Sequence, residues 1–295
     1  MNSGPTVLFC VGATKAGTSW LHRYLSDHEQ CHLRSIKELH YFDALENGTL
    51  ATQTKRNQIA RQDLSDRLGD ANPTKAANIL RQLGDREHWL DVLARPAPDV
   101  AAYHGYLTGG LQDETVVADM TPAYALLSGD RLRAMAAIAP DTRFIYLLRD
   151  PVARLWSHVR MMAARRADDG IVRRGRADRI FDRVLKGREE QIAMRSDYRS
   201  AIDKLAASVD PGRLLITFYE DLFDGDGLGR ICQFLSIRKT PADIGRKIHQ
   251  GQALAMLDDQ RRRARAWLKE QYEFVQAHLG TPPAAWQYEM ARVQV

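Results

Sequence analysis

One stretch near the start of the chain decides the fold, and it reads Thr6-Val7-Leu8-Phe9-Cys10-Val11-Gly12-Ala13-Thr14-Lys15-Ala16-Gly17-Thr18-Ser19. Its first six residues form a short apolar run ended by glycine, which is typical of a buried parallel strand. Residues 18–25 then place apolar side chains at helical spacing. A glycine-flanked turn between a strand and a helix points backbone N–H groups at an anion. The stretch therefore predicts an anion-binding loop in an α/β fold.

This loop differs from the common ATP- and GTP-binding pattern, G-x-x-x-x-G-K-[ST]. The glycine spacing fits, but Thr18 stands where that pattern has lysine, and Lys15 lies inside the loop instead. We expect the Lys15 ammonium at the crest of the turn, where it would meet a leaving oxygen directly. Taken alone, the loop leaves a second interpretation open, in which two turn glycines flank an ordinary surface lysine.

Strands and helices alternate along the rest of the chain. Further strands are expected over residues 115–119, 144–148 and 214–218, and helices over residues 54–68, 73–93, 131–138, 152–162, 198–207, 228–235 and 264–279. This alternation predicts an α/β fold with a central, mostly parallel sheet flanked by helices on both faces. No linker rich in Pro, Gly or Ser divides the chain, so we expect a single domain over residues 1–295.

The composition is that of an ordinary globular chain and excludes a collagen-like or wholly disordered protein. The 295 residues are 44% apolar, and 42 Lys and Arg against 37 Asp and Glu give a net charge of +5. No apolar run approaches the ~20 residues of a membrane-spanning helix, and residues 7–11 are too few for a signal-peptide core. The three cysteines (Cys10, Cys31, Cys232) lie far apart, so neither a disulfide framework nor a structural zinc site is expected. We therefore expect a cytoplasmic location.

Positive charge gathers between residues 160 and 195. The basic residues there are Arg160, Arg165, Arg166, Arg173, Arg174, Arg176, Arg179, Arg183, Lys186, Arg188 and Arg195, and acidic residues lie among them. A mixed-sign stretch of this kind usually forms a solvated helical face, which is the interpretation we favour. The alternative is a surface that attracts an anionic ligand or acceptor.

Two motifs resemble those of a known family. Lys15-Ala16-Gly17-Thr18-Ser19-Trp20 resembles the K-x-G-T-[ST]-W loop of sulfotransferases that use 3′-phosphoadenosine 5′-phosphosulfate (PAPS). The family's second signature is a strand that ends in Arg-Asp-Pro, with a serine eight residues after the arginine; here these are Arg149-Asp150-Pro151 and Ser157. In the family the arginine and serine hold the 3′-phosphate of the donor, as charge-assisted hydrogen bonds would allow.

This resemblance implies a P-loop NTPase-like sulfotransferase architecture, with PAPS as the donor, adenosine 3′,5′-bisphosphate as the product and no metal. The donor contacts that it implies are Lys15, Ala16, Gly17, Thr18, Ser19, Trp20, Arg149, Ser157 and Tyr198. Three of these residues also have a simpler interpretation: Arg149 would pair with Asp150, Ser157 would face solvent, and Trp20 would pack in the core. The joint spacing of the two motifs favours the donor site.

A third segment, Lys37-Glu38-Leu39-His40-Tyr41-Phe42-Asp43, resembles the K-E-x-H-[FY]-F-D segment of carbohydrate O-sulfotransferases. In those enzymes the glutamate removes the proton of the acceptor hydroxyl. Glu38 is therefore the first candidate for the general base and His40 the second. The alternatives are that Glu38 only pairs with Lys37 or Arg34, and that His40 is a packed core residue.

Weaker matches continue along the chain. Thr121-Pro122-Ala123-Tyr124 resembles the family's T-P-[AS]-Y step, although Met120 stands where carbohydrate members commonly have a basic residue. This departure argues against an acceptor with an anionic group at that point. Residues 218–222 resemble the Y-E-D-L step, and residues 246–251 stand where relatives place a loop over the adenine and 3′-phosphate.

The resemblance implies transfer of a sulfuryl group to the hydroxyl of a carbohydrate or another alcohol, with no nucleic acid as partner. Two rival functions stay open. An ATP- or GTP-using P-loop enzyme would need a lysine at position 18 and a strand-end aspartate for Mg²⁺. A non-enzymatic protein that binds polyanions through residues 160–195 would show binding that falls steeply with salt.

Overall fold

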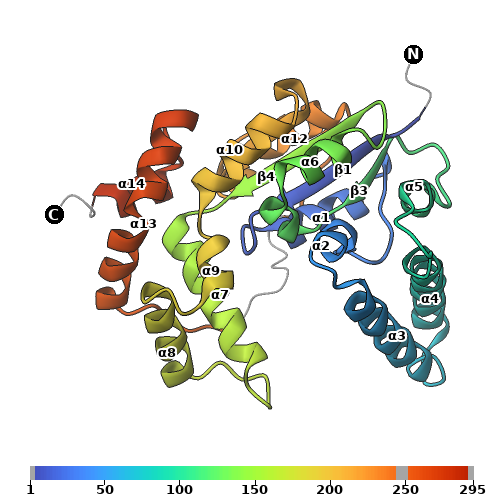
Figure 1. The fold of residues 1–295 in the computed structure, drawn as a ribbon, viewed down its shortest axis with the longest axis horizontal. Helices are drawn as coiled ribbons and strands as arrows, with labels where there is room; N and C mark the ends of the chain where they lie inside the picture. The colour runs from blue at the N-terminus through green and yellow to red at the C-terminus, as the bar shows by residue number, and fades with distance from the viewer. Residues whose placement is uncertain (1–3, 244–251, 292–295) are drawn as a thin grey trace.

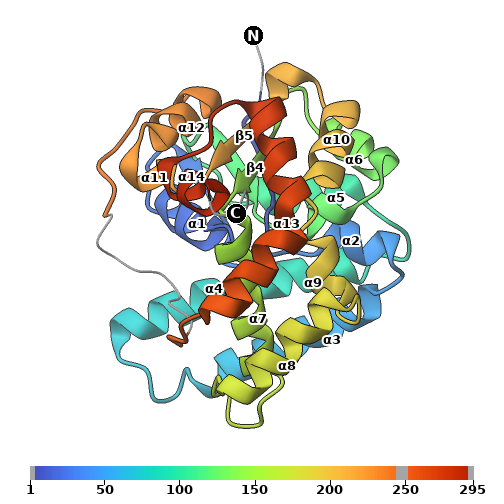
Figure 2. The ribbon, with the colours of Figure 1, turned by 90° about the vertical axis from the view of Figure 1, so that its left-hand side faces the viewer.

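A computed structural model describes residues 4–243 and 252–291, and its centre is a five-stranded sheet (Figure 1). The strands are β1 (Thr6–Gly12), β2 (Cys31–His32), β3 (Val116–Asp119), β4 (Thr142–Leu148) and β5 (Leu214–Phe218), in the order β2-β3-β1-β4-β5. Every pairing between neighbouring strands is parallel. Helices α1 and α12 lie on one side of the strands and α6 and α10 on the other (Figure 2). The expected α/β class and helix-covered parallel sheet are confirmed.

The helices have the following bounds. They are α1 (Thr18–Ser26), α2 (Tyr41–Glu46), α3 (Leu50–Asp66), α4 (Pro73–Leu93), α5 (Val100–Thr108), α6 (Gly129–Ala136), α7 (Pro151–Arg165), α8 (Arg174–Leu185), α9 (Glu190–Met194), α10 (Tyr198–Ser208), α11 (Asp221–Asp224), α12 (Gly227–Leu235), α13 (Asp258–Leu279) and α14 (Ala284–Ala291). Short 3₁₀ turns cover Pro122–Leu126 and Pro211–Arg213. No helix within the described ranges has both the length and the apolar character needed to cross a membrane.

The central strand β1 is wholly buried because it lies between β3 and β4 with helices over both faces. Phe9 shows the packing, with its ring against Phe42, Tyr124 and Phe144 at centroid distances of 5.9, 6.4 and 5.3 Å. One cluster of buried apolar side chains runs from Val7 to Trp286. The proposal of a single domain over the full length stays a prediction.

Because the strands are parallel, the four chain segments that follow β1, β3, β4 and β5 all lie at the carboxyl ends of the strands. After β1 the chain forms β2 and β3 on one side of β1, and it then forms β4 and β5 on the other side. The strand order therefore reverses direction at β1. In open parallel sheets, ligands bind beyond the carboxyl ends of the strands at such a point. The residues that follow β1, β3, β4 and β5 are the 13–17 loop, Thr121, Arg149 and Tyr219.

The basic stretch between residues 160 and 195 forms the end of α7, α8 and α9, and several of its charges are paired within the chain. Glu189 is only 7% exposed and accepts hydrogen bonds from Arg166 and Arg183 at 2.7 and 2.8 Å. Arg173 and Arg174 pair with Asp169 and Asp178. These ion pairs support the interpretation of much of this stretch as a solvated structural face.

We expect Glu189→Gln to lower the free energy of unfolding at pH 7 by about 1–2 kcal/mol, because a buried acceptor of two guanidinium groups loses its charge. The Arg166 hydrogen bond, opposed by burial and aided by Arg183, lowers the pKa of Glu189 from 4.5 to about 2. Since the pKa is depressed in the folded state, the stabilisation is complete above pH 4.5 and is lost as the pH falls toward 2.

Urea unfolding of the wild type and the variant at pH 7 and pH 3 measures this difference. Glu190→Gln, a change at the exposed neighbour, is the matched control and should have little effect. Equal unfolding free energies for wild type and Glu189→Gln at pH 7 would contradict the account.

Candidate active site

The loop of residues 13–17 joins the carboxyl end of β1 to α1. Gly17 has a φ of +87°, and a Cβ there would lie 2.2 Å from the ring of Tyr219, so no other residue fits without rearrangement. The amide of Ala13 donates to the carbonyl of Leu147 at 2.7 Å, which fixes the loop to β4. No side chain caps the start of α1, so the first-turn amides stay available for an anion.

The amides of the loop are not all equally available. The amide of Ala16 donates to the carbonyl of Ala13 at 3.0 Å inside the loop. Of the predicted amide contacts, those of Gly17, Thr18 and Ser19 are therefore the ones left for a ligand. Thr18 is buried, whereas Ser19 is half-buried at the start of the helix.

Lys15 stands at the crest of the loop with a φ of +71° and is half-buried. Burial lowers the pKa of its ammonium, and the positive charges of Arg149, Arg165 and Arg160 lower it further. Within the described residues no carboxylate pairs with Lys15. Cations gathered without an acid in a concave site are stabilised when an anion binds among them.

Arg149 lies directly beside this loop. Its Nη1 donates to the carbonyl of Lys15 at 3.1 Å, and its guanidinium stacks over the ring of Tyr219, 4.9 Å from the centroid. The alternative pairing with Asp150 is not formed, because that carboxylate accepts from the Ala153 amide at 2.7 Å and caps α7. The two motifs that the sequence analysis joined therefore meet at one place.

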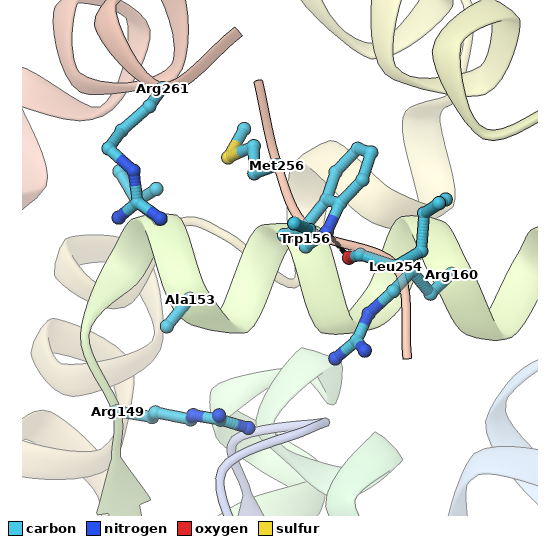
Figure 3. Close-up of a pocket in the computed structure, with 9 residues that line it drawn as sticks. Arg149, Ala153, Trp156, Arg160, Leu254, Met256 and Arg261 are labelled. Carbon is cyan, nitrogen blue, oxygen red and sulfur yellow. Dashed lines mark hydrogen bonds between the residues drawn. The ribbon is translucent and has the colours of Figure 1, made fainter. Parts of the chain in front are cut away.

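A cavity of about 230 Å³ opens beside Arg149 along α7 (Figure 3). Its lining residues are Arg149, Val152, Ala153, Trp156, Arg160, Leu254, Ala255, Met256 and Arg261. In Figure 3 the side chains of Arg149 and Arg160 extend below α7, whereas those of Trp156 and Met256 lie above the helix. Three arginines beside an indole and a thioether suit a ligand that is anionic at one end and flat and apolar at the other.

The segment that follows residue 251 lies across α7 and closes one side of this cavity. The indole N–H of Trp156 donates to the carbonyl of Leu254 at 2.7 Å, and Arg160 donates to the carbonyl of Gln252 at 3.1 Å. The predicted adenine-contacting loop over residues 246–251 lies outside the described residues. The structure does show that the chain immediately after it reaches the cavity.

Ser157 does not face solvent, as the simpler interpretation of this helix residue would require. It is only 9% exposed and lies on α7 between Ala153 and Arg160, both of which line the cavity. Its own side chain is not part of the lining. Within the described ranges its hydroxyl has no hydrogen-bond partner, which leaves it free for a ligand oxygen.

Two predicted donor contacts have little or no exposed surface. Trp20 is 8% exposed, stacks on Tyr24 at a centroid distance of 6.0 Å and meets the ring of Phe223 edge-on at 4.9 Å. Tyr198 is fully buried, and its hydroxyl donates to the carbonyl of Arg149 at 2.6 Å. Trp20 thus packs as a core residue and Tyr198 supports the backbone of Arg149, while their donor contacts stay predictions.

The predicted acceptor side is a short turn of residues 37–41 that leads into α2, and its charged side chains are Lys37, Glu38 and His40. The Nζ of Lys37 lies 2.6 Å from Oε1 of Glu38 and 3.5 Å from Oγ1 of Thr18, so this turn touches the start of α1. The imidazole of His40 lies between two carboxylates, with Nε2 at 3.5 Å from Glu38 and Nδ1 at 2.8 Å from Asp43. The Glu38 side chain is 40% exposed and is the part of the turn open to solvent.

These contacts set the protonation states of the turn. Burial alone would raise the pKa of Glu38, but the hydrogen bond from His40 and the nearby Lys37 bring it down to about 2. Burial alone would lower the pKa of His40, but its contacts with Asp43 and Glu38 raise it to about 9. At neutral pH, Glu38 is therefore ionised and His40 is protonated. With a pKa of about 2, the carboxylate is a weak base while these contacts hold it.

Three residues complete the site without having been assigned a role there from the sequence, although Lys37, Arg160 and Tyr219 each lie in a stretch that the sequence singles out. Lys37 links Glu38 to the loop, Tyr219 supports both Gly17 and Arg149, and Arg160 brings a second guanidinium to the cavity. A signal existed for Arg160, since it lies three residues after Ser157 on the predicted helix and eleven after Arg149. Tyr219 lies in the Y-E-D-L match of residues 218–222, but that match did not indicate its role, which depends on how β5 lies beside β4.

Comparison with known proteins gives the family. Residues 5–241 match the model of the sulfotransferase family. A sulfotransferase from Alicyclobacillus acidocaldarius is similar in structure, with a TM-score of 0.57 and 21% identity over 97% of this chain and 99% of that one. At that identity it shows the fold alone. A search of curated proteins found no match.

Two further structures are similar over nearly the whole chain but too distant to carry an argument. The sulfotransferase domain from the Synechococcus PCC 7002 olefin synthase has a TM-score of 0.47 and 18% identity, covering 99% of this chain and 94% of that one. The sulfotransferase domain from the curacin biosynthetic pathway has a TM-score of 0.44 and 16% identity, covering 98% of each chain. Since the family model matches most of its residues, this chain belongs to the sulfotransferase family.

Proposed function

We propose that this protein transfers the sulfuryl group of PAPS to the hydroxyl of a carbohydrate or another alcohol, and releases adenosine 3′,5′-bisphosphate. The observation that carries the proposal is that the Arg149 guanidinium contacts the loop that bears Lys15, at the carboxyl ends of β1 and β4, and that neither cation is paired with an acid in the described ranges. A donor with phosphate groups at two ends fits this pair of cations. Membership of the family supports sulfuryl transfer, and the identity of the donor belongs to the proposal.

The chain offers separate groups to each end of such a donor. The amides of Gly17, Thr18 and Ser19 and the Ser19 hydroxyl would hold the 5′-phosphosulfate. Arg149, with Ser157 and Arg160, would hold the 3′-phosphate beside the cavity. The donor supplies an activated sulfuryl group bonded to a phosphate oxygen.

Lys15 would stabilise the negative charge that grows on that bridging oxygen as the S–O bond breaks. A preorganised donor of this kind contributes about 3–4 kcal/mol in comparable sites. The crest position in the loop holds the ammonium in place before reaction, so little reorganisation is needed. Burial, and then the neighbouring arginines, keep the pKa of Lys15 lowered, and an anion bound beside the ammonium would counter both effects.

Glu38 would accept the proton of the acceptor hydroxyl as the new S–O bond forms. It is ionised at neutral pH and exposed, whereas His40 is protonated and held by Asp43. His40 and Lys37 would therefore orient the carboxylate, and His40 stays the second candidate for the base. The closeness of this turn to those of carbohydrate O-sulfotransferases, and a cytoplasmic location, stay predictions.

The geometry gives less support to the two rival functions. A Mg²⁺-dependent P-loop enzyme needs a free strand-end carboxylate, but Asp119 at the end of β3 is 1% exposed and accepts three hydroxyl hydrogen bonds, and Asp150 caps α7. A polyanion-binding protein needs free charge over residues 160–195, but Arg166, Arg173, Arg174 and Arg183 are paired with acids.

Transfer of ³⁵S from labelled PAPS to a panel of simple sugars, glycosaminoglycan chains, phenols and aliphatic alcohols tests the proposal. We expect label in at least one hydroxyl compound, and thermal stabilisation by adenosine 3′,5′-bisphosphate but not by ATP with Mg²⁺. Stabilisation by ATP with Mg²⁺ alone would favour the P-loop rival. Binding only to heparin, lost steeply with salt and unchanged in Lys15→Ala, would favour the polyanion rival.

We expect Lys15→Ala to lower kcat for transfer by about 10²–10³-fold, because the leaving oxygen loses its cation. The affinity for adenosine 3′,5′-bisphosphate should change little, since the amides and Arg149 still hold it. Single-turnover transfer and calorimetry measure the two effects. Lys75→Ala on the exposed start of α4 is the control, and unchanged turnover in Lys15→Ala would remove the assigned role.

We expect Arg149→Ala to weaken adenosine 3′,5′-bisphosphate by about 10- to 100-fold, because a charge-assisted pair with the 3′-phosphate is lost. Adenosine 5′-phosphate, which lacks that group, should lose far less affinity. Calorimetric titration with both nucleotides gives the comparison, with Arg262→Ala on the exposed face of α13 as control. Equal losses for both nucleotides would show that Arg149 does not hold the 3′-phosphate.

We expect Glu38→Gln to lower kcat for transfer by about 10²–10⁴-fold while donor affinity stays near that of the wild type, because only proton removal is affected. The measurement is kcat with the best acceptor from the panel, alongside product affinity. Glu87→Gln at an exposed acid of α4 serves as control. A wild-type rate in Glu38→Gln would move the base to His40 or elsewhere.

A further inference from the structure

A buried carboxylate, Asp119, lies close to the turn of residues 37–41 and takes no part in the proposed chemistry. Asp119 ends β3, beside the central strand, and is 1% exposed. Its Oδ1 accepts from the hydroxyl of Thr121 at 2.6 Å, and its Oδ2 accepts from the hydroxyls of Tyr103 and Tyr124 at 2.7 and 2.8 Å. Burial raises the pKa of Asp119 to about 6, against the lowering effect of these hydroxyls, so the carboxylate is ionised at neutral pH.

Two of these three hydroxyls also accept hydrogen bonds from backbone amides of the turn of residues 37–41. The Oγ1 of Thr121 accepts from the amide of Leu39 at 3.0 Å and lies 3.5 Å from that of His40. The hydroxyl of Tyr124 accepts from the amide of Tyr41 at 3.0 Å. Each hydroxyl donates to Asp119, so its lone pairs point at the turn. The third hydroxyl, on Tyr103, bonds Asp119 and no amide of the turn.

The turn that these bonds hold has an uncommon backbone. His40 has a φ of +53°, in the left-handed region that a residue with a side chain enters only at a cost. Such a conformation persists where the surroundings fix it, and here the amides on both sides of His40 are fixed by hydroxyls. The left-handed residue starts α2 and leaves the imidazole between Glu38 and Asp43.

The Thr121-Pro122-Ala123-Tyr124 segment has the right local structure for this task. Pro122 begins a 3₁₀ turn, and the amide of Tyr124 donates to the carbonyl of Thr121 at 3.1 Å. Thr121 itself is extended, with φ −107° and ψ +98°, and precedes the turn that carries Tyr124, while both hydroxyls bond the same carboxylate of Asp119. The motif therefore presents two hydroxyls side by side, between the carboxylate at the end of β3 and the turn.

We propose that Thr121 and Tyr124, anchored by Asp119, are positioning residues that hold the left-handed turn at His40 and so fix Glu38 and His40 in their working geometry. That this geometry serves proton removal rests on the proposed function. That the hydroxyls set the geometry does not depend on it. The two can therefore fail separately.

The test compares two tyrosines that differ in one respect. Tyr103→Phe and Tyr124→Phe each remove a buried hydroxyl from Asp119, and both rings are 0% exposed. Only Tyr124→Phe also removes an acceptor from an amide of the turn. A titration of His40 followed by NMR of histidine-labelled protein reads out the geometry, because the pKa of His40 depends on its contacts with Glu38 and Asp43.

We expect the pKa of His40 to stay near 9 in Tyr103→Phe and to fall by about one unit or more in Tyr124→Phe, a tenfold change in its proton affinity. Thr121→Val should lower it likewise, and Thr121→Ser, which keeps the hydroxyl, should restore it. Adenosine 3′,5′-bisphosphate should bind all four variants as it binds the wild type.

A His40 pKa that is unchanged in both Tyr124→Phe and Thr121→Val would overturn the proposal, as would equal shifts in Tyr103→Phe and Tyr124→Phe. If one tyrosine variant loses its cooperative thermal transition, the Thr121→Val and Thr121→Ser pair decides. Wild-type protein that fails to bind adenosine 3′,5′-bisphosphate would contradict the proposed function, while the His40 titrations would still test the positioning role.

Discussion

The contact between the Arg149 guanidinium and the carbonyl of Lys15 is the constraint on which the site depends. It joins the turn after β4 to the loop after β1, two neighbouring strands of a parallel sheet. Because a carbonyl takes up only one of the guanidinium donors and no carboxylate joins them in the described ranges, the positive charges remain uncompensated. An anion with two charged ends that binds to these cations therefore raises the free energy of unfolding of the protein.

The opposite side of the loop carries paired charges of both signs. Lys37 links Thr18 to Glu38, so the carboxylate that would remove a proton is held near the start of α1. Behind it, the hydroxyls of Thr121 and Tyr124 connect the turn to Asp119. The site thus has a cationic half, which we propose holds the donor, and a half of mixed charge, which we propose meets the acceptor; each half is fixed by residues that follow a strand.

The fold and the two cationic anchors could be predicted from sequence because their signals are local: an apolar run, a glycine-flanked turn, and an arginine before Pro151. The short β2 and the later α8 were not predicted, since two strand residues show no periodicity and a charged amphipathic helix resembles a solvated loop. Burial of Tyr198 and the support that Tyr219 gives Gly17 depend on packing between distant segments, which spacing in one sequence does not encode.

The most direct test of the central claim is calorimetric titration of the wild-type protein with adenosine 3′,5′-bisphosphate and with its two single-phosphate fragments, adenosine 5′-phosphate and adenosine 3′-phosphate. If the amides at the start of α1 and the Arg149 guanidinium hold opposite ends of one ligand, the bisphosphate binds at one site per chain and far more tightly than either fragment. A bisphosphate that binds no more tightly than the better fragment would show that the two anchors do not act on one molecule.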